Sequence, residues 1–511
     1  MRKLIPVIFL IVIFLSACSV NPVTGKRELM MVSSAQEIAM GKQSYAPMQQ
    51  SQGGVYDVDP ALTNYVQSVG TRVAAQSGVS LPYEFIVLNN SVPNAWALPG
   101  GKIAINRGLL TELGSESELA AVLGHEAVHA AARHTAQQIS RSQIMQVGVA
   151  ATAIASSGSD YGNLLAGGAG MVAQLSLSKY GRSAELESDR YGMQYMSMAG
   201  YDPTGAVALQ KTFVRLSEDR QSDWLSGLFA SHPPSQERVE ANIATAAALP
   251  PGGRSGKAEF QAVMRKTMST MPAYKAYDDG RKALAEDKVD QALSLANTAL
   301  GLYGEEAHFH ALRGDARLAA DKYDMAITNY NRAITRRADF FYYHLQRGVA
   351  NKELGRTDNA VTDLNRSIEL LPTAPAYFAL GNIAEERGDF AVAIGHYKVV
   401  AKSGGEYGKA ATAALVRLEL PTNPGAYIAR GCDADGSGNL IVSVRNDTQV
   451  TITGVQVAVS YADSSGRTAQ QRYSIAGQIP SGQVASVNTG MGPFTPGSSC
   501  PVEVVAAQIV N

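Results

Sequence analysis

Cysteine, tryptophan and charged residues are all scarce in this chain of 511 residues. It contains three cysteines and two tryptophans, and Asp, Glu, Lys and Arg make up 17% of it. Three cysteines exclude a disulfide-rich scaffold and a four-cysteine zinc ribbon. The 44 Lys and Arg residues balance the 45 Asp and Glu residues, which leaves a net charge of −1. Such a chain has no overall field that would concentrate nucleic acid, so we expect no nucleic-acid partner.

Long apolar runs are missing downstream of residue 15, so the body of the chain contains no predicted membrane span. The run that does occur, Leu4–Leu15, follows Arg2 and Lys3 and is too short to cross a bilayer, which is typical of a signal peptide. It leads into Leu-Ser-Ala-Cys18, which resembles the lipobox of bacterial lipoproteins. We therefore expect residues 1–18 to be a lipoprotein signal peptide with Cys18 retained and lipidated. An ordinary cleaved signal or an uncleaved anchor is the alternative.

The residue after Cys18 and the two remaining cysteines indicate the cellular compartment in which the protein is located. Ser19 resembles the residue at this position in lipoproteins sorted to the outer membrane of Gram-negative bacteria. That resemblance implies a protein anchored to the cell outer membrane and facing the periplasm. Disulfides persist outside the cytoplasm, so we predict that Cys432 and Cys500 pair. Closing a loop of about 68 residues stabilises a fold by roughly 4 kcal/mol in the chain-entropy model.

Two joints rich in proline and glycine divide the chain, Leu249–Gly253 and Pro421–Gly425. They leave three segments, 19–249, 257–420 and 425–511, which agrees with about three or four domains for a chain of this length. Each segment has its own hydrophobic periodicity, so we expect three different architectures.

The middle segment, 257–420, repeats with a period of about 34 residues. The recurring small residues are Gly280, Gly314, Gly348 and Gly381, with Ala292, Ala326, Ala360 and Ala393. Small residues at fixed points of such a unit let two helices pack closely, and the pattern resembles the tetratricopeptide repeat. It predicts an α-solenoid of about four repeats that binds a protein partner, with a plain helical bundle as the alternative.

The last segment, 425–511, changes to the alternation typical of strands. Its β-branched runs are Leu440–Val444, Val450–Tyr461, Tyr473–Ile475, Gln483–Val487 and Val502–Val510. Short strands separated by turn residues predict a β-sandwich. The predicted disulfide would join its first strand region to its last. No catalytic constellation is present here, so we expect a binding or bracing role.

The first segment contains the sequence His125-Glu-Ala-Val-His129 in an otherwise apolar stretch. Ser115 with Glu118 three residues later predicts the start of a helix by a capping box. Histidines four residues apart project from one face of a helix, which is the spacing that two imidazoles need to share one zinc ion. Glu126 lies next to that face, where it can take a proton from metal-bound water.

A second helix offers the missing ligand in the sequence Glu185-Leu-Glu187-Ser-Asp189. Glu185 and Asp189 are four residues apart and share a face, whereas Glu187 lies about 200° round the helix from Glu185. We therefore expect Glu185 to be the third metal ligand and Asp189 to orient a histidine through its second nitrogen. Glu187 is expected to face solvent, with Glu187 as the ligand being the competing assignment. His134 is expected to be structural or to support a ligand.

Together these residues resemble a zinc endopeptidase family, that of the CAAX prenyl proteases and HtpX. The similar segments are Asn94–Asn106, Gly108–Leu110, Glu118–His129, Glu185–Gly192, Ser231–Pro234 and Arg238. A soluble periplasmic branch of the family also joins a peptidase domain to tetratricopeptide repeats, and its mature lipoproteins begin with a sequence similar to Asn21–Leu29. The resemblance covers the first segment closely and the repeats by architecture. It does not extend to residues 425–511.

The resemblance implies the roles of several residues. His125, His129 and Glu185 would bind Zn²⁺, and Glu126 would be the catalytic base. The strand containing Asn94, Ala95 and Trp96 would pair with an extended substrate, although a core hairpin is the alternative. His232 would donate to the oxyanion, fill the fourth zinc position and keep the enzyme latent, or be structural. Arg238 would brace the site through an ion pair.

The sequence therefore predicts a multidomain α+β protein with a mostly helical zincin-type peptidase domain, an α-solenoid of tetratricopeptide repeats and a C-terminal β-sandwich. We expect a zinc-dependent endopeptidase that degrades or processes misfolded or misassembled envelope proteins. This substrate class is what the resemblance implies. The alternative is a periplasmic chaperone or assembly scaffold that acts through its repeats, with latent or minor proteolysis. The intact motif argues against a purely non-catalytic protein.

Overall fold

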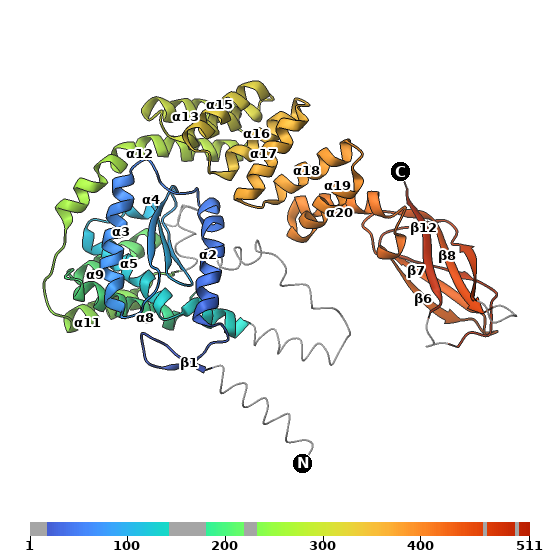
Figure 1. Ribbon diagram of the computed structural model, residues 1–511, viewed down its shortest axis with the longest axis horizontal. Coiled ribbons are helices and arrows are strands. Elements are labelled where there is room, and N and C mark those ends of the chain that lie inside the picture. The colour runs from blue at the N-terminus through green and yellow to red at the C-terminus, as the bar shows by residue number, and fades with distance from the viewer. Residues whose placement is uncertain (1–17, 143–179, 219–231, 463–467, 496–499, 511) are drawn as a thin grey trace, which may run out of the picture. The chain divides into compact units, whose positions relative to one another are not determined.

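The structure is a computed structural model that describes residues 18–142, 180–218, 232–462, 468–495 and 500–510 (Figure 1). The apolar run Leu4–Leu15 of the expected signal peptide lies outside the described residues. The chain divides into two compact units, Met1–Gln346 and Arg347–Asn511. No helix of the described residues is both long and apolar enough to span a membrane.

The first unit begins with a short hairpin and continues into a small sheet surrounded by helices. The hairpin strands are β1 (Cys18–Val20) and β2 (Arg27–Leu29). The sheet strands are β3 (Glu84–Leu88), β4 (Ala95–Leu98) and β5 (Lys102–Asn106). The helices around the sheet are α2 (Ser34–Ser51), α3 (Pro60–Ala74), α4 (Arg107–Leu110), α5 (Glu116–Ala131), α8 (Arg182–Met198), α9 (Thr204–Glu218) and α11 (Gln236–Ala248).

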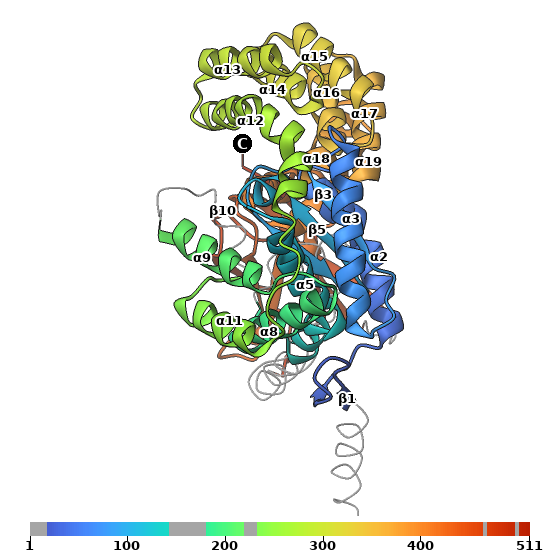
Figure 2. The ribbon, with the colours of Figure 1, turned by 90° about the vertical axis from the view of Figure 1, so that its left-hand side faces the viewer.

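The sheet has the order β3-β5-β4 and separates two apolar layers. Strand β3 runs parallel to β5, and β4 runs antiparallel to it, with Ala95 opposite Ile105. One face, with Trp96 among its side chains, packs on Met48 of α2. The other face packs on α3 and α5, which Figure 2 shows beside the strands. Strand side chains alternate between the two faces, which explains why nearly all of them are buried.

Helix α5 lies in the centre of this unit and carries the His-Glu-x-x-His sequence. Its predicted start is confirmed: Ser115 is the N-cap, and its side chain accepts a hydrogen bond from the Glu118 backbone at 3.3 Å. The reciprocal bond of a capping box is replaced, because the Glu118 carboxylate accepts from the Gly114 backbone at 3.0 Å. Nearly every residue of the helix is buried. Its polar side chains therefore need partners inside the protein.

The repeats form antiparallel helix pairs, as predicted. The helices are α12 (Lys257–Ala285), α13 (Val289–Leu302), α14 (Ala307–Leu318), α15 (Tyr323–Arg336), α16 (Phe341–Glu353), α17 (Thr357–Leu370), α18 (Ala374–Glu386), α19 (Phe390–Val400) and α20 (Gly405–Glu419). The boundary between the two compact units falls inside α16.

The recurring small residues lie where the two helices of a pair approach each other closely. A Cβ atom on Gly314 would lie 2.6 Å from the Tyr330 ring, and one on Gly381 would lie 2.6 Å from the Tyr397 ring. The four recurring alanines are all fully buried: Ala292, Ala326, Ala360 and Ala393. A larger side chain at these positions would force the paired helices apart, which explains the spacing seen in the sequence.

The first repeats share a hydrophobic core with the sheet region. Phe260, Tyr274 and Phe309 belong to the same apolar cluster as Tyr56 and Leu62. Polar contacts reinforce the junction. His308 Nε2 lies 3.0 Å from the Gly53 carbonyl oxygen, Asn89 Nδ2 donates to Glu306 Oε2 at 3.1 Å, and the Arg107 guanidinium lies 3.5 Å from the centre of the Tyr274 ring. Residues 257–346 are therefore built into the first unit.

Residues 425–511 form the predicted sandwich of two antiparallel sheets. One sheet has the order β11-β7-β6, and the other has the order β10-β8-β12 with β9 also paired to β8. The strands are β6 (Ile428–Ala434), β7 (Leu440–Asn446), β8 (Ile452–Ala462), β9 (Thr468–Ser474), β10 (Gln478–Ile479), β11 (Val484–Asn488) and β12 (Val502–Ile509). Strand β6 was not expected, because its sequence lacks an alternation of β-branched residues.

The structure contains the predicted disulfide. Cys432 on β6 bonds to Cys500 just before β12, with 5.4 Å between their Cα atoms. Because β6 and β12 belong to different sheets, the bond links the two layers of the sandwich. The predicted fold class, a helical peptidase-type region with repeats and a C-terminal sandwich, is confirmed.

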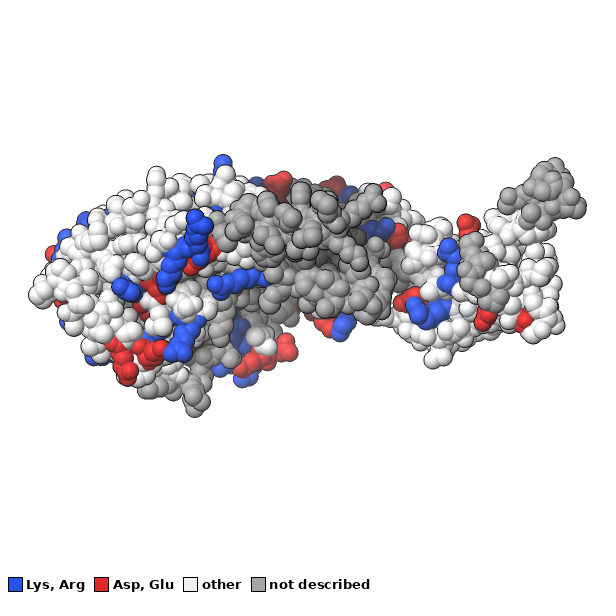
Figure 3. All heavy atoms as spheres, turned by 90° about the horizontal axis from the view of Figure 1, so that it is seen from below, with Lys and Arg blue, Asp and Glu red and all other residues white. Residues whose placement is uncertain are grey.

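Charged side chains of both signs are mixed on the surface. In the described part of the face in Figure 3, Lys and Arg side chains lie among Asp and Glu, separated by uncharged residues. This distribution agrees with the net charge of −1.

Candidate metal centre

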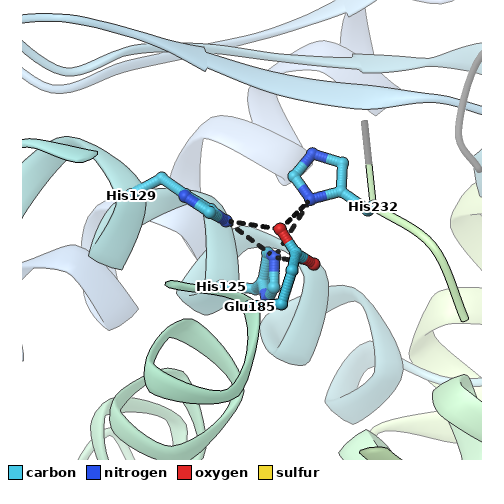
Figure 4. A group of neighbouring side chains, drawn as sticks. All are labelled: His125, His129, Glu185 and His232. Carbon is cyan, nitrogen blue, oxygen red and sulfur yellow. Dashed lines mark hydrogen bonds and ion pairs between the residues drawn. The ribbon is translucent and has the colours of Figure 1, made fainter. Parts of the chain in front are cut away.

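Helix α5 brings His125 and His129 to one point, as their spacing predicts. The two Nε2 atoms lie 3.0 Å apart, and both imidazoles are buried. Figure 4 shows them directed at the same small region. A separation of four residues places two side chains on successive turns of one helix face, which is sufficient to explain this geometry.

Glu185 of α8 and His232, in the segment before α11, join the two histidines to form a group of four residues. Glu185 Oε1 lies 3.4 Å from His129 Nε2 and 3.0 Å from His232 Nδ1. His232 Nδ1 also lies 3.3 Å from His125 Nε2. One ligand atom from each of these four buried residues falls within 4.8 Å of all the others (Figure 4). The arrangement therefore matches a compact metal site with three nitrogens and a carboxylate.

The predicted supporting residues, Asp189 and Arg238, lie directly behind His125. His125 Nδ1 is 2.9 Å from Asp189 Oδ1. Arg238 of α11 donates from Nε and Nη2 to the two oxygens of Asp189 at 2.7 Å each. Its Nη1 lies 2.9 Å from Glu185 Oε2. One guanidinium therefore fixes both carboxylates of α8, and Asp189 in turn orients the His125 ring.

The expectation that Glu187 faces solvent is wrong. Its side chain is only 17% exposed, and its Oε1 lies 3.3 Å from His134 Nε2. Glu187 lies about 200° round α8 from Glu185, as its position two residues later requires. The turn after α5 and the N-terminal hairpin cover that side of α8. A projection of α8 alone does not show segments that come from elsewhere in the chain. His134 itself lies 2.9 Å, Nδ1 to Nδ1, from His129.

Glu126 lies beside the metal group next to a small cavity. Its Oε1 is 3.5 Å from His232 Nε2, and its Oε2 has no hydrogen-bond partner among the described residues. The cavity has a volume of 30 Å³ and is lined by His125, Glu126, His232 and apolar side chains that include Ala95. This is room for about one or two water molecules. The unpartnered carboxylate oxygen is thus positioned to bind one.

Burial and the neighbouring charges set the pKa values in this site. Burial raises the pKa of Glu126, although His232 and His125 oppose the shift. For Glu185, burial alone would also raise the pKa, but His232 and the hydrogen bonds from His129 and His232 outweigh it and hold it well below the usual value. Burial holds the pKa of His129 well below its ordinary value, so this imidazole stays neutral. A neutral imidazole beside an ionised carboxylate is what a metal ligand set requires.

The residues present fit a divalent cation. Glu185 and Asp189, whose pKa values are held below the usual range, share the guanidinium of Arg238, so one of their two negative charges is left uncompensated in a buried site when the histidines are neutral. Uncompensated buried charge is costly unless a cation balances it. Imidazole nitrogens and one carboxylate oxygen are also the ligands that Zn²⁺ prefers.

The expected substrate strand is the edge strand of the sheet. Among the described strands, β4 pairs with β5 alone. Ala95 lines the cavity beside Glu126, whereas Trp96 points to the opposite face, in the cluster with Met48. Asn94 Oδ1 has no hydrogen-bond partner among the described residues. The strand side chains are buried, and the outer backbone edge is unpaired by any described strand, so pairing with a substrate stays a prediction.

One residue at the site carried no signal in the sequence. The Tyr180 ring stacks on His129 with 3.8 Å between ring centres, and its hydroxyl lies 3.0 Å from Thr135 Oγ1. Tyr180 precedes α8 and belongs to no motif or periodic pattern. Only the tertiary structure places it against a ligand.

Comparisons with known proteins agree with this site. A beta-barrel assembly-enhancing protease of Yersinia pestis is 34% identical over 179 residues, which are 34% of this chain and 36% of that protein. The mitochondrial metalloendopeptidase OMA1 of Schizosaccharomyces pombe is 34% identical over 223 residues, 43% of this chain and 63% of that protein. The chain thus spans less than two thirds of the length of either relative.

Among solved structures, an Arabidopsis OM64 TPR domain is 20% identical, with a TM-score of 0.23, and the match covers 23% of this chain and 98% of that one. The first unit has a family match of its own: residues 60–245 match peptidase family M48, whose members are zinc metallopeptidases. That range contains all four residues of the metal group together with Glu126. Residues 60–245 therefore form a domain of peptidase family M48.

Proposed function

We propose that the protein is a zinc-dependent endopeptidase in which His125, His129 and Glu185 hold the metal and Glu126 is the general base. The observation that carries the proposal is the convergence of the ligand atoms within 4.8 Å beside a buried carboxylate oxygen that lacks a partner. Bound zinc lowers the pKa of a coordinated water to about 7 and polarises a carbonyl group. Glu126 then accepts the proton from the attacking water and returns it to the departing amine.

The supporting residues keep the ligands in place during this reaction. Asp189 accepts from His125 Nδ1, so His125 presents its unprotonated Nε2 to the metal. Arg238 holds Asp189 and neutralises part of the charge on Glu185. His232 reaches the same point from another segment, and of its three expected roles we propose that it occupies the fourth metal position in a resting enzyme.

The substrate is proposed to be an extended polypeptide that pairs with the outer edge of β4. Ala95 and Trp96 lie on this edge strand, Asn94 directly precedes it, and Ala95 also lines the cavity beside Glu126. A free strand edge beside a peptidase centre favours substrates without stable structure. We propose misfolded or misassembled envelope proteins as the substrates, supported by the name of the Yersinia pestis relative, a beta-barrel assembly-enhancing protease.

We propose that the lipidated Cys18 anchors the protein to the cell outer membrane on the periplasmic side. The short apolar run, the lipobox-like sequence and Ser19 support this location. The domain limits 19–249, 257–420 and 425–511 are our proposal from the two proline- and glycine-rich joints.

A second function, holding a client protein through the repeats, is favoured by a pocket in the first unit. This pocket has a volume of 330 Å³ and lies between α12, α14 and the loops after α2 and β3. Aromatic side chains, including Tyr277, Phe341 and Tyr342, and the paired charges of Arg281 and Asp315 line it. Such a mixed surface suits the backbone and side chains of a polypeptide.

Zinc analysis combined with a Glu126→Gln variant tests the peptidase proposal. We expect one zinc per chain in both proteins, cleavage of an unfolded outer-membrane protein by the wild type, and loss of at least about 100-fold in the variant. Glu240→Gln, an exposed carboxylate on α11, is the matched control and should cleave normally. A wild type without zinc, or a Glu126→Gln variant that cleaves at the normal rate, would disprove the proposal.

The holding function is tested in the Glu126→Gln background, where cleavage does not interfere. We expect this protein to suppress aggregation of an unfolded outer-membrane protein. Adding Tyr277→Ala in the 330 Å³ pocket should weaken the suppression. If Tyr277→Ala has no effect, or if the Glu126→Gln protein never suppresses aggregation, the repeats do not hold clients through this pocket.

A further inference from the structure

The sequence Asn21–Leu29 directly after the expected lipid anchor forms a tight hairpin organised by Asn21. Strands β1 and β2 pair with Cys18 opposite Leu29 and Val20 opposite Arg27. Asn21 is completely buried. Its Oδ1 accepts from the Val23 and Thr24 backbones at 2.9 and 3.3 Å, which fixes the turn. The oxygen of the Asn21 amide therefore bonds to the hairpin backbone, and its nitrogen is left for other partners.

The other half of this amide reaches the metal-binding helix. Asn21 Nδ2 donates to Glu28 Oε2 at 3.1 Å within the hairpin and to Glu187 Oε1 at 3.3 Å on α8. Glu187 is 166 positions away in the chain and only two residues after the ligand Glu185. The hairpin thus binds to α8 beside the metal group.

Glu187 continues the contact to a second ligand through His134. His134 Nε2 lies 3.3 Å from Glu187 Oε1, and His134 Nδ1 lies 2.9 Å from His129 Nδ1. A metal-binding His129 Nε2 is unprotonated, so its proton is on Nδ1 and is donated to His134 Nδ1. His134 then carries its own proton on Nε2 and donates it to Glu187. The positions of His129, His134 and Glu187 thus allow one consistent set of donors and acceptors.

The chain turn that brings His134 under His129 is itself held by the N-terminal segment. Arg133 has a φ angle of 63°, which is unfavourable for a residue other than glycine. Its Nε donates to Glu37 Oε1 at 2.6 Å and its Nη2 donates to the Val32 carbonyl oxygen at 2.6 Å. Nη1 reaches Ser19 Oγ at 3.4 Å. Contacts from residues 19–37 therefore hold Arg133 in this conformation.

We propose that the N-terminal hairpin is a positioning element of the metal site, in which Asn21 fixes Glu187, Glu187 fixes His134, and His134 orients the ligand His129. The inference rests on the proposed zinc site. It gives His129 a support equivalent to the one that Asp189 and Arg238 give His125. Through these contacts, the segment that follows the proposed lipid anchor also influences how tightly the site binds zinc.

The test removes two members of this chain of hydrogen bonds in the full-length protein. Asn21→Asp keeps an oxygen for the Val23 and Thr24 backbones but replaces the donor to Glu187 with a second carboxylate. Glu187→Ala removes Oε1, the atom that both Asn21 and His134 contact. In the double variant the residue at position 21 has no further way to act on His134, because its contact runs through Glu187. Arg27→Ala, exposed on the same hairpin, is the control.

The readout is the zinc dissociation constant, measured by competition with a chelator. We expect each single variant to bind zinc about 10-fold more weakly, the control to bind within about twofold of the wild type, and the double variant to bind no more weakly than Glu187→Ala alone. Equal affinity in the wild type and Asn21→Asp, or a double variant in which the two losses multiply, overturns the inference. If Asn21→Asp does not fold, Glu187→Ala against the wild type decides it, and equal affinity of these two overturns the inference.

Failure of this inference is distinguishable from failure of the proposed function. A wild type that binds zinc tightly while Asn21→Asp matches it refutes only the role of the hairpin. A wild type that binds no zinc refutes the metal site and the inference together.

Discussion

Gly192 of α8 lies directly against the backbone of His125 on α5. A Cβ atom on Gly192 would come within 2.9 Å of the His125 backbone nitrogen and 3.0 Å of the Gly124 carbonyl carbon. The two helices that supply three of the four proposed metal ligands therefore touch backbone to backbone. Contact this close is possible only where a side chain is missing, and it fixes how far Glu185 stands from the two histidines.

We expect Gly192→Ala to separate the two helices and weaken the metal site. Overpacking at a backbone contact costs about 1–3 kcal/mol, and the displaced Glu185 should lower the affinity for zinc. Urea unfolding and chelator competition measure the two effects. Gly181→Ala, at the N-cap of the same helix with nothing within 4 Å of its Cβ position, should leave the affinity for zinc unchanged, although alanine is a poorer N-cap than glycine. Wild-type zinc affinity in Gly192→Ala would show that the close contact does not set the ligand geometry.

We expect His232→Ala to vacate the proposed fourth metal position and so to increase the rate of cleavage. His232 Nδ1 lies 3.0 Å from Glu185 Oε1 and 3.3 Å from His125 Nε2, which is where a catalytic site needs water. We expect the variant to keep zinc on its three other ligands and to cleave an unfolded protein severalfold faster. A fall in turnover of about 100-fold or more with zinc retained would indicate an oxyanion donor instead. Loss of zinc would indicate a structural role.

Acid should weaken the junction between the first repeats and the sheet region through His308. Burial lowers the pKa of His308 to about 4, although Glu306 partly opposes the shift. The unfolded chain binds a proton near pH 6.5 and the folded protein does not, so stability is full above pH 6.5 and falls as the pH drops toward 4. From pH 7 to pH 5 the loss from this group is about 2 kcal/mol.

Urea unfolding of His308→Gln at pH 7 and pH 5 measures this contribution. The variant should be less stable at pH 7 but lose less between the two pH values than the wild type. Tyr343→Phe removes the hydroxyl that lies 2.5 Å from His308 Nδ1 without removing the imidazole. It should keep the wild-type pH dependence. Identical pH slopes for His308→Gln and the wild type would contradict the assignment.

Removing the disulfide should destabilise the C-terminal sandwich alone. Replacing Cys432 and Cys500 with alanine opens a loop spanning 68 positions, and we expect the free energy of unfolding of residues 425–511 to fall by about 4 kcal/mol. Thermal unfolding followed by circular dichroism should show the same shift when the wild type is reduced. Zinc content and peptide cleavage should not change. An unchanged transition in both experiments would mean that the sandwich does not depend on the bond.

Local spacing predicted the parts of the site that lie on single helices. His125 and His129 share a face of α5, and Glu185 and Asp189 share a face of α8, because a separation of four residues does this in any α-helix. The repeats were predictable for a similar reason. Three glycines of the 34-residue period have their nearest neighbour within their own helix pair: Gly314 against Tyr330, Gly348 against Leu364 and Gly381 against Tyr397.

Residues that approach the site from elsewhere could not be predicted in this way. Tyr180 has no periodic pattern, and the side of α8 that carries Glu187 is covered by Asn21 and His134 from distant parts of the chain. The joint at Leu249–Gly253 also gave no indication that Tyr274 and Phe309 lie in one core with Tyr56. Proline and glycine mark a change of direction in the chain, and they do not show whether the segments on either side pack together.

The sequence by itself determined the candidate residues and the types of element: two imidazoles on one helix with a carboxylate between them, an array of small-residue helix pairs, and a strand-rich end with two cysteines. The sharing of a helix face and the repeat pattern depend on interactions within a helix or between neighbouring helices in the chain. The tertiary structure alone decided that His232 joins the metal group, that Glu187 is half-buried and bonded to His134, and that the N-terminal hairpin contacts Glu187. These contacts join residues that are far apart in the chain, and only the packing of the whole unit brings them together.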